Sequence, residues 1–163
     1  MTANKAINHY VSTVMSIKIL NLDLTTQIKG LFEAEIKNPV ELIYFYSPDN
    51  CEMCEEMGQL LDEIIALSDK LHLTKNIFDE NLPIAEKFNV NLAPGLVVAG
   101  SDDGQLTDYG IRFAGVPAGY EFGSLIQAII MVSRRDSGLK PAIRERLKEI
   151  HQPVHLQVFV TPT

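Results

Sequence analysis

Apolar residues in the first half of the chain alternate between helical spacing and a run of β-forming residues. From Leu24 to Ile36 an apolar residue recurs every three or four positions, which predicts a helix with Asp23 as its N-cap. Residues 40–46 (VELIYFY) are nearly all apolar and are typical of a central strand buried on both faces. A turn over residues 47–50 then precedes a second amphipathic helix that continues to residue 67.

The second half of the chain adds three strands and two helices. Residues 71–78 predict a shorter strand, and a short helix starts at residues 81–83. Residues 95–99 and 107–113 predict two strands joined by a hairpin turn at residues 101–104, and residues 122–135 predict an amphipathic helix. The order strand, helix, strand, helix, hairpin, helix predicts an α/β fold with a mixed central sheet and helices on both faces.

The tail repeats the opening of this pattern. Residues 149–153 (EIHQP) match residues 35–39 (EIKNP), and the apolar run after each proline is similar. We therefore divide the chain into an N-terminal extension (1–20), a complete unit (21–136) and the helix and strand of an incomplete second unit (137–163). The alternative is that helix–proline–strand junctions simply look alike. Whether the chain is a natural short form or a fragment stays open.

The strand predicted in the tail must place its apolar side chains somewhere. Leu156, Val158 and Val160 would form an exposed apolar strand if nothing covered them. We expect the tail either to pack on the first unit or to form a homodimer with a second copy. The predicted helix before it carries Ile143, Leu147 and Ile150.

Charge and hydropathy exclude some partners. The net charge is −7 and the isoelectric point is about 5.0, which argues against nucleic acid as the main partner because phosphate binding needs a basic face. The apolar runs are too short to span a membrane, and the first residues do not have the pattern of a signal peptide. We therefore expect a cytoplasmic protein without a membrane partner.

The sequence contains two cysteines, Cys51 and Cys54, at the start of the helix that follows the central strand. Free N–H groups and the helix dipole at that end lower the pKa of a thiol, and the thiolate is the reactive form. We expect Cys51 to be exposed in the first turn and to attack a substrate disulfide. Cys54, one turn later on the apolar face, then resolves the mixed disulfide. This pattern predicts a thiol–disulfide oxidoreductase.

Other interpretations of the pair are weaker or stay open. The two cysteines could be inert core residues, although their place at a helix start argues against this. Zinc requires about four ligands, and no second CxxC or histidine pair has the right spacing, so we expect no metal and no cofactor. A non-catalytic redox-sensing or protein-interaction module remains the alternative function. Glu52, Glu55 and Glu56 oppose thiolate formation, which predicts a comparatively reducing pair.

Ala93 and Pro94 form a second candidate site, at the entry to the strand over residues 95–99. In a redox fold of this order, a cis peptide here would lie beside the dithiol, and the Ala93 backbone could pair with a substrate chain. The alternative is a trans proline that opens an edge strand. Tyr44 and Tyr46 are expected to be core residues or pocket walls.

These motifs resemble a known family. The cysteine motif, Ala93-Pro94 and the segment Gly115–Phe122 (GVPAGYEF) resemble the first half of the glutaredoxin-like protein disulfide oxidoreductases, which carry two thioredoxin-fold units in one chain. The resemblance implies a thioredoxin fold and cytosolic exchange with protein disulfides, with Cys51 and Cys54 as the redox pair and Pro94 as the cis-proline. It also implies a thioredoxin-reductase-like flavoenzyme and peroxiredoxins as partners. The second active site of that family is missing here.

Overall fold

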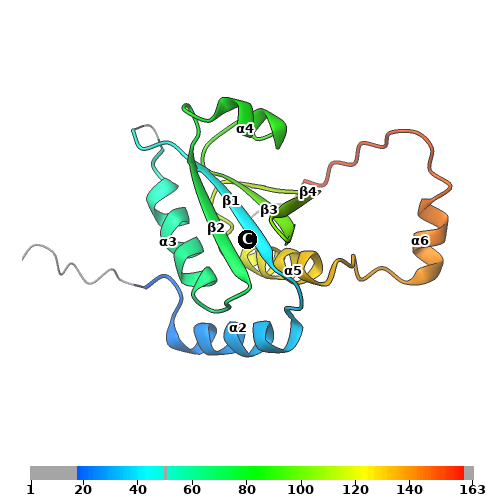
Figure 1. Cartoon of the computed structure of the whole chain (residues 1–163), viewed down its shortest axis with the longest axis horizontal. Helices are drawn as coiled ribbons and strands as arrows, with labels where there is room; N and C mark the ends of the chain where they lie inside the picture. The colour runs from blue at the N-terminus through cyan, green and yellow to red at the C-terminus, as the bar shows by residue number, and fades with distance from the viewer. Residues whose placement is uncertain (1–17, 50, 160–163) are drawn as a thin grey trace, which may run out of the picture.

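The fold places a four-stranded sheet between helices (Figure 1). The computed structural model describes residues 18–49 and 51–159. The elements in chain order are α2 (Leu22–Glu35), β1 (Val40–Tyr46), α3 (Cys54–Ile65), β2 (Leu71–Ile77), α4 (Leu82–Lys87), β3 (Gly95–Asp102), β4 (Gln105–Ala114), α5 (Tyr120–Arg134) and α6 (Pro141–Leu147).

The sheet is mixed, in the strand order β2-β1-β3-β4. Strand β1 pairs in parallel with β2 and antiparallel with β3, and β3 pairs antiparallel with β4. Five of the seven residues of β1 are buried, because it is an inner strand covered on both faces. Asp103 and Gly104 both adopt positive φ angles in the turn between β3 and β4, which fits the predicted hairpin.

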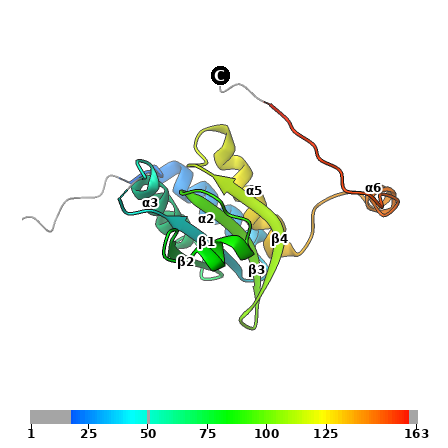
Figure 2. The same cartoon turned by 90° about the horizontal axis from the view of Figure 1, so that it is seen from above.

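The helices cover the two faces of the sheet unequally (Figure 2). Helices α2, α3 and α5 pack on one face over a large apolar core that includes Leu42, Tyr44 and Leu96. The short helix α4 packs on the other face, where Phe88 contacts a smaller cluster around Phe45. Helices lie on both faces, as predicted.

The start of the ordered unit differs from the sequence prediction. Asn21, not Asp23, caps α2, because its side-chain oxygen accepts the N–H of Leu24 at 2.8 Å. Asp23 lies inside the first turn of the helix. Leu20 was expected in the extension, but it is buried in the core, and the Glu63 carboxylate on α3 accepts its N–H at 2.9 Å. Residues 1–17 of that extension lie outside the described residues.

The tail forms its helix but not its strand. Residues 151–159 have neither helical nor strand structure, and Leu156 and Val158 are each 85% exposed. The predicted strand is therefore wrong over this stretch, because a strand needs a hydrogen-bonding neighbour and none of the described strands pairs with it. Packing of these two side chains on the first unit is also wrong, and Figures 1 and 2 show the tail leading away from the sheet. Val160 lies outside the described residues.

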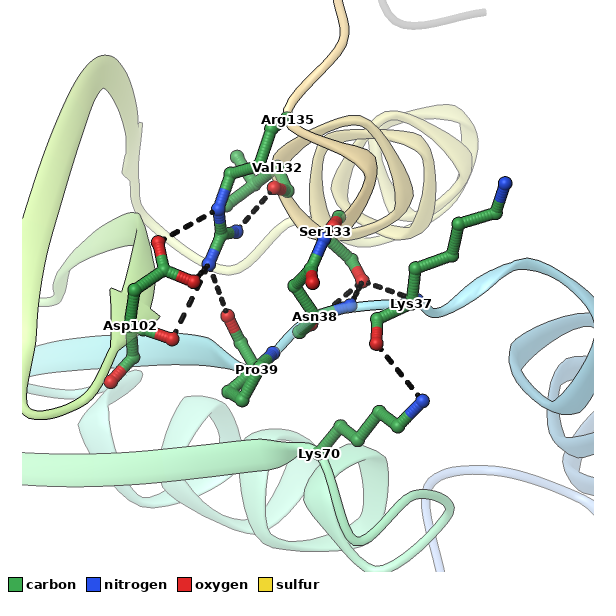
Figure 3. Close-up of polar contacts among 9 residues, drawn as sticks. Lys37, Asn38, Pro39, Lys70, Asp102, Val132, Ser133 and Arg135 are labelled. Atoms are coloured by element: carbon green, nitrogen blue, oxygen red, sulfur yellow. Dashed lines mark hydrogen bonds and ion pairs between the residues drawn. The ribbon is translucent and has the colours of Figure 1, made fainter.

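A cluster of polar groups closes the end of the sheet where β1 begins (Figure 3). The Ser133 hydroxyl on α5 accepts the N–H groups of Lys37 and Asn38 at 2.8 and 3.0 Å and donates to the Asn38 carbonyl at 2.7 Å. Ser133 is fully buried, so one side chain satisfies three backbone groups of the segment that enters β1.

Arg135 extends this cluster to the end of β3. Its guanidinium donates to the carbonyls of Val132 and Pro39, at 2.5 and 3.0 Å, and forms an ion pair with Asp102 at 2.8 Å. Gly100 lies directly beneath it, because a Cβ atom there would come within 2.8 Å of the Arg135 Cζ. The guanidinium therefore joins the end of α5 to β1 and β3.

No helix within the described part of the chain is both long and apolar enough to cross a bilayer.

Candidate functional site

The two cysteines lie at the end of the sheet opposite the Ser133 and Arg135 cluster. Strand β1 ends at Tyr46, and the chain then passes through the segment over residues 47–53 into α3. Cys51 and Cys54 form a disulfide with their Cα atoms 5.4 Å apart. Cys51 is partly exposed, whereas Cys54 is only 6% exposed, so a molecule in solution can approach the first sulfur and not the second.

The structure corrects the predicted position of Cys51. It lies in a turn before the helix, not in the first helical turn, because Met53 has backbone angles outside the helical region and α3 begins at Cys54. The Cys54 N–H donates to the Cys51 carbonyl at 3.3 Å and closes that turn. Met53 is the N-cap, and no side chain caps the helix. The N-terminal N–H groups of α3 therefore lie next to the sulfurs without a side-chain acceptor.

Cys54 is fixed from both sides by residues at the end of β1. The Tyr44 hydroxyl donates to the Cys54 carbonyl at 2.6 Å, and the Ser47 N–H points at the Cys54 sulfur at 3.5 Å. Burial, together with the nearby Tyr46 hydroxyl, raises the pKa of Tyr44 to about 12. Tyr44 therefore stays protonated at neutral pH and acts as a hydrogen-bond donor.

A groove of about 630 Å³ opens beside the disulfide, between α3 and the strands β1 and β2. The rings of Tyr44 and Tyr46 stack in its wall with their centroids 5.6 Å apart, as the sequence led us to expect of pocket-wall residues. The lining residues are Tyr44, Tyr46, Ser47, Pro48, Cys51, Glu52, Cys54, Glu55, Gly58, Gln59, Asp62 and Lys75.

The charges in this groove are unequal. Lys75 on β2 forms an ion pair with Asp62 on α3 at 2.8 Å. Glu52 and Glu55 lie nearer the cysteines in sequence, and neither forms a salt bridge within residues 18–49 and 51–159. The groove therefore carries unneutralised negative charge beside the disulfide.

The Ala93–Pro94 peptide bond is cis in the structure. Because β1 and β3 are antiparallel with Phe45 opposite Gly95, this peptide lies at the same end of the sheet as the segment leading to the cysteines. Ala93 and Pro94 do not line the groove itself. A Cβ atom at Gly95 would come within 2.6 Å of Val90 and 2.8 Å of the Leu92 carbonyl, so glycine is required directly after Pro94.

The sequence analysis did not identify Asp62 and Lys75 as parts of this region. They are 13 residues apart, and the parallel register of β1 and β2 brings Lys75 opposite Tyr44. The helical spacing of Cys54, Gly58 and Asp62 was the available signal for this face of α3. Among the described residues, no group of three or more His, Cys, Asp or Glu side chains could hold a metal ion.

Sequence comparison finds relatives in staphylococci. Residues of this chain are 34% identical over 145 positions to AhpF, the flavin-letter-designated component of alkyl hydroperoxide reductase, from Staphylococcus epidermidis, and 32% identical to the same protein from Staphylococcus aureus. The match covers 89% of this chain, which spans about a quarter (25%) of the length of these relatives. No family model matches the chain.

Structure comparison agrees on the fold. A protein disulfide oxidoreductase from Aeropyrum pernix superposes with a TM-score of 0.67 at 27% identity, over 81% of this chain and 56% of that one. The NTD_N/C domain of the alkylhydroperoxide reductase AhpF from Enterococcus faecalis gives a TM-score of 0.69 at 24% identity, over 78% and 59% of the two chains. These neighbours, with the sheet order above, identify the predicted thioredoxin fold.

Proposed function

Because this chain is a thioredoxin-type oxidoreductase that fits the glutaredoxin-like, two-unit family, we propose that it exchanges dithiols and disulfides with protein substrates through Cys51 and Cys54. The observation that carries the proposal is the local disulfide, which joins a partly exposed sulfur at the mouth of a groove to a buried one. A disulfide that joins residues three apart adds little to the stability of the fold, so its use is chemical.

The proposed reaction transfers two electrons from the reduced chain to a substrate disulfide. The Cys51 thiolate attacks one substrate sulfur, a bond forms between them, and the other substrate sulfur leaves as a thiolate. Cys54 then loses its proton and attacks the Cys51 sulfur, which releases the first substrate sulfur as a second thiolate. The chain is left with the Cys51–Cys54 disulfide, and each released thiolate takes up a proton according to its pKa.

Two features support Cys51 as the attacking residue. It is the more accessible sulfur, because Cys54 is only 6% exposed. The N-terminus of α3 has no side-chain cap, so its N–H groups and dipole favour negative charge on a nearby sulfur. Cys54 is placed to resolve, since it is held against β1 by the Tyr44 hydroxyl.

Ala93 and Pro94 are proposed as the substrate-binding backbone. The start of β3 lies at the cysteine end of the sheet, and the Ala93 peptide groups could pair with an extended substrate chain held by the mixed disulfide. The support for this assignment is the position of the peptide in the sheet.

Partners and location are extensions of the same proposal. A thioredoxin-reductase-like flavoenzyme is proposed as electron donor and a peroxiredoxin as acceptor, supported by relatives named as components of alkyl hydroperoxide reductase. A cytoplasmic location follows from that role. We also propose that residues 137–163 begin a second thioredoxin-like unit and that its exposed apolar tail can pair with a second copy. Light scattering of the full chain over a range of concentrations tests the homodimer, and a constant monomer mass excludes it.

The test of the function is multiple-turnover reduction of insulin by dithiothreitol. The native chain should accelerate the reaction, and Cys51→Ser should reduce the rate to that of dithiothreitol alone while the fold, followed by circular dichroism, is retained. A chain that undergoes a single oxidation with a change of oligomeric state, but without turnover, would instead be a redox-sensing module. Turnover that survives Cys51→Ser contradicts the proposal.

A further inference from the structure

The carboxylates beside the disulfide are not all explained by the helix they belong to. Glu55 and Glu56 lie in the first turn of α3, where acidic side chains stabilise the helix dipole. Glu52 precedes the helix in the turn between the cysteines, yet it also lines the groove. Glu56 does not line the groove, although it neighbours Glu55 in the same helical turn. Glu52 and Glu55 therefore share a position at the sulfurs that Glu56 lacks.

The positive charge in the groove does not neutralise these two carboxylates. Lys75 is the groove's cationic side chain, and its ammonium group is already paired with Asp62, further along α3. The groove thus offers two carboxylates beside the cysteines and an aromatic wall formed by Tyr44 and Tyr46. Lysine and arginine are suited to such a surface, because their stems pack on aromatic rings while their charged ends reach carboxylates.

We propose that this groove selects protein disulfides whose cysteine is flanked by lysine or arginine, with Glu52 and Glu55 binding the cationic side chain. The inference rests on the proposed dithiol–disulfide exchange and names the substrate class for that site. Concave surfaces of one charge concentrate ligands of the opposite charge and raise their association rates. A bound cation also offsets the repulsion between these carboxylates and the Cys51 thiolate, so the matching substrate itself favours the attacking form.

The test compares two peptide disulfides that differ only in the residue two positions from the cysteine, lysine in one and glutamate in the other. Each kcat/KM value is divided by the rate constant of the same peptide with dithiothreitol, an uncharged dithiol, which removes differences in intrinsic reactivity. At low ionic strength we expect the lysine peptide to be preferred by about tenfold or more, within the range that electrostatic steering produces. At about 1 M salt, where screening acts over roughly 3 Å, the preference should fall to about twofold or less.

Variants then locate the effect. Glu52→Gln and Glu55→Gln should each reduce the lysine preference by about threefold or more, and the double variant should nearly abolish it. Glu56→Gln is the matched control, because it removes the same charge from the next residue of α3 but not from the groove; it should change the preference by less than about twofold. Since the preference is a ratio within one variant, a change in thiol reactivity common to both peptides cancels.

Three outcomes overturn the inference. Equal corrected rates for the two peptides would exclude selection by charge, while turnover of both would leave the proposed exchange intact. Equal effects of all three glutamate variants would assign the preference to the net charge of the chain and not to the groove. Failure to turn over either peptide would overturn the proposed function together with the inference.

Discussion

The two ends of strand β1 carry polar groups of opposite kinds. Where β1 begins, Ser133 and Arg135 satisfy backbone carbonyls and N–H groups that would otherwise be buried unpaired. Where β1 ends, the polar groups belong to a groove, a partly exposed sulfur, and the carboxylates of Glu52 and Glu55, which form no ion pair within the described residues. The first arrangement holds elements together, and the second leaves binding capacity available to another molecule.

The contrast separates stability from function along one strand. Groups with complete hydrogen bonds in the interior contribute to the free energy of unfolding, because their loss leaves partners unsatisfied. Groups that stay unpaired at a surface cost little in the folded chain and can be used on binding. Changes at the start of β1 should therefore alter stability, and changes at its end should alter chemistry.

The largest expected effect is the difference in reactivity between the two sulfurs. In the reduced chain, iodoacetamide should modify Cys51 at least about tenfold faster than Cys54, because Cys54 is buried and Cys51 is accessible. Mass spectrometry of peptides from a timed reaction measures both rates. In concentrated urea, which exposes both thiols, the two rates should become similar. A faster Cys54 in the folded chain contradicts the assignment of roles.

Ser133→Ala tests the structural end of β1. We expect the free energy of unfolding to fall by about 1–3 kcal/mol, because the N–H groups of Lys37 and Asn38 lose a buried acceptor. Urea denaturation measures the loss, and insulin reduction per folded molecule should not change. Ser137→Ala is the control: this exposed serine should cost less than about 0.5 kcal/mol. Lost activity with unchanged stability would break the comparison.

Tyr44→Phe removes the hydroxyl that donates to Cys54 and should lower the free energy of unfolding by about 1 kcal/mol at pH 7. The pKa of Tyr44 is raised to about 12 in the folded chain, so the folded state holds its proton more tightly than the unfolded state. That stabilisation is complete below pH 10 and is lost as the pH rises from about 10 to 12.

Urea denaturation between pH 9 and pH 12 measures this loss. The native chain should lose stability more steeply than Tyr44→Phe, because the variant no longer carries the titrating group. Tyr109→Phe, at an exposed tyrosine on β4, should follow the native chain. Parallel curves for the native chain and Tyr44→Phe would show that the Tyr44 hydroxyl is not held as described.

The smallest effects come from adding a methyl group at each end. Gly58→Ala should raise the free energy of unfolding by about 0.5–1 kcal/mol, because alanine is the better helix former. The new Cβ would lie 3.6 Å from the Tyr44 ring, an ordinary contact. Gly100→Ala should instead lower it by about 1 kcal/mol, because the new Cβ displaces the Arg135 guanidinium from its acceptors. Thermal unfolding of both variants gives the signs, and equal signs would contradict the contrast between the two ends.

Local patterns predicted the features that depend on neighbouring residues. The apolar run over residues 40–46 predicted the inner strand, and the CxxC spacing predicted the disulfide at its end. The helix start was predicted less well, because Met53 gives no cap signal and Cys51 lies in the turn before α3.

Long-range partners were beyond the sequence patterns. Ser133 meets Asn38 across 95 residues, and Lys75 enters the groove through the register of β1 and β2. The alternating tail over residues 153–159 predicted a strand, but alternation alone cannot supply the neighbouring strand that its hydrogen bonds require.

The most direct test of the central claim is to trap the mixed disulfide. Reduced Cys54→Ser, incubated with insulin, should accumulate a covalent complex in which mass spectrometry finds Cys51 bonded to an insulin cysteine. Reduced Cys51→Ser should form little complex under the same conditions, because the remaining sulfur is only 6% exposed. Equal trapping by both variants, or trapping through Cys54 alone, would contradict the account.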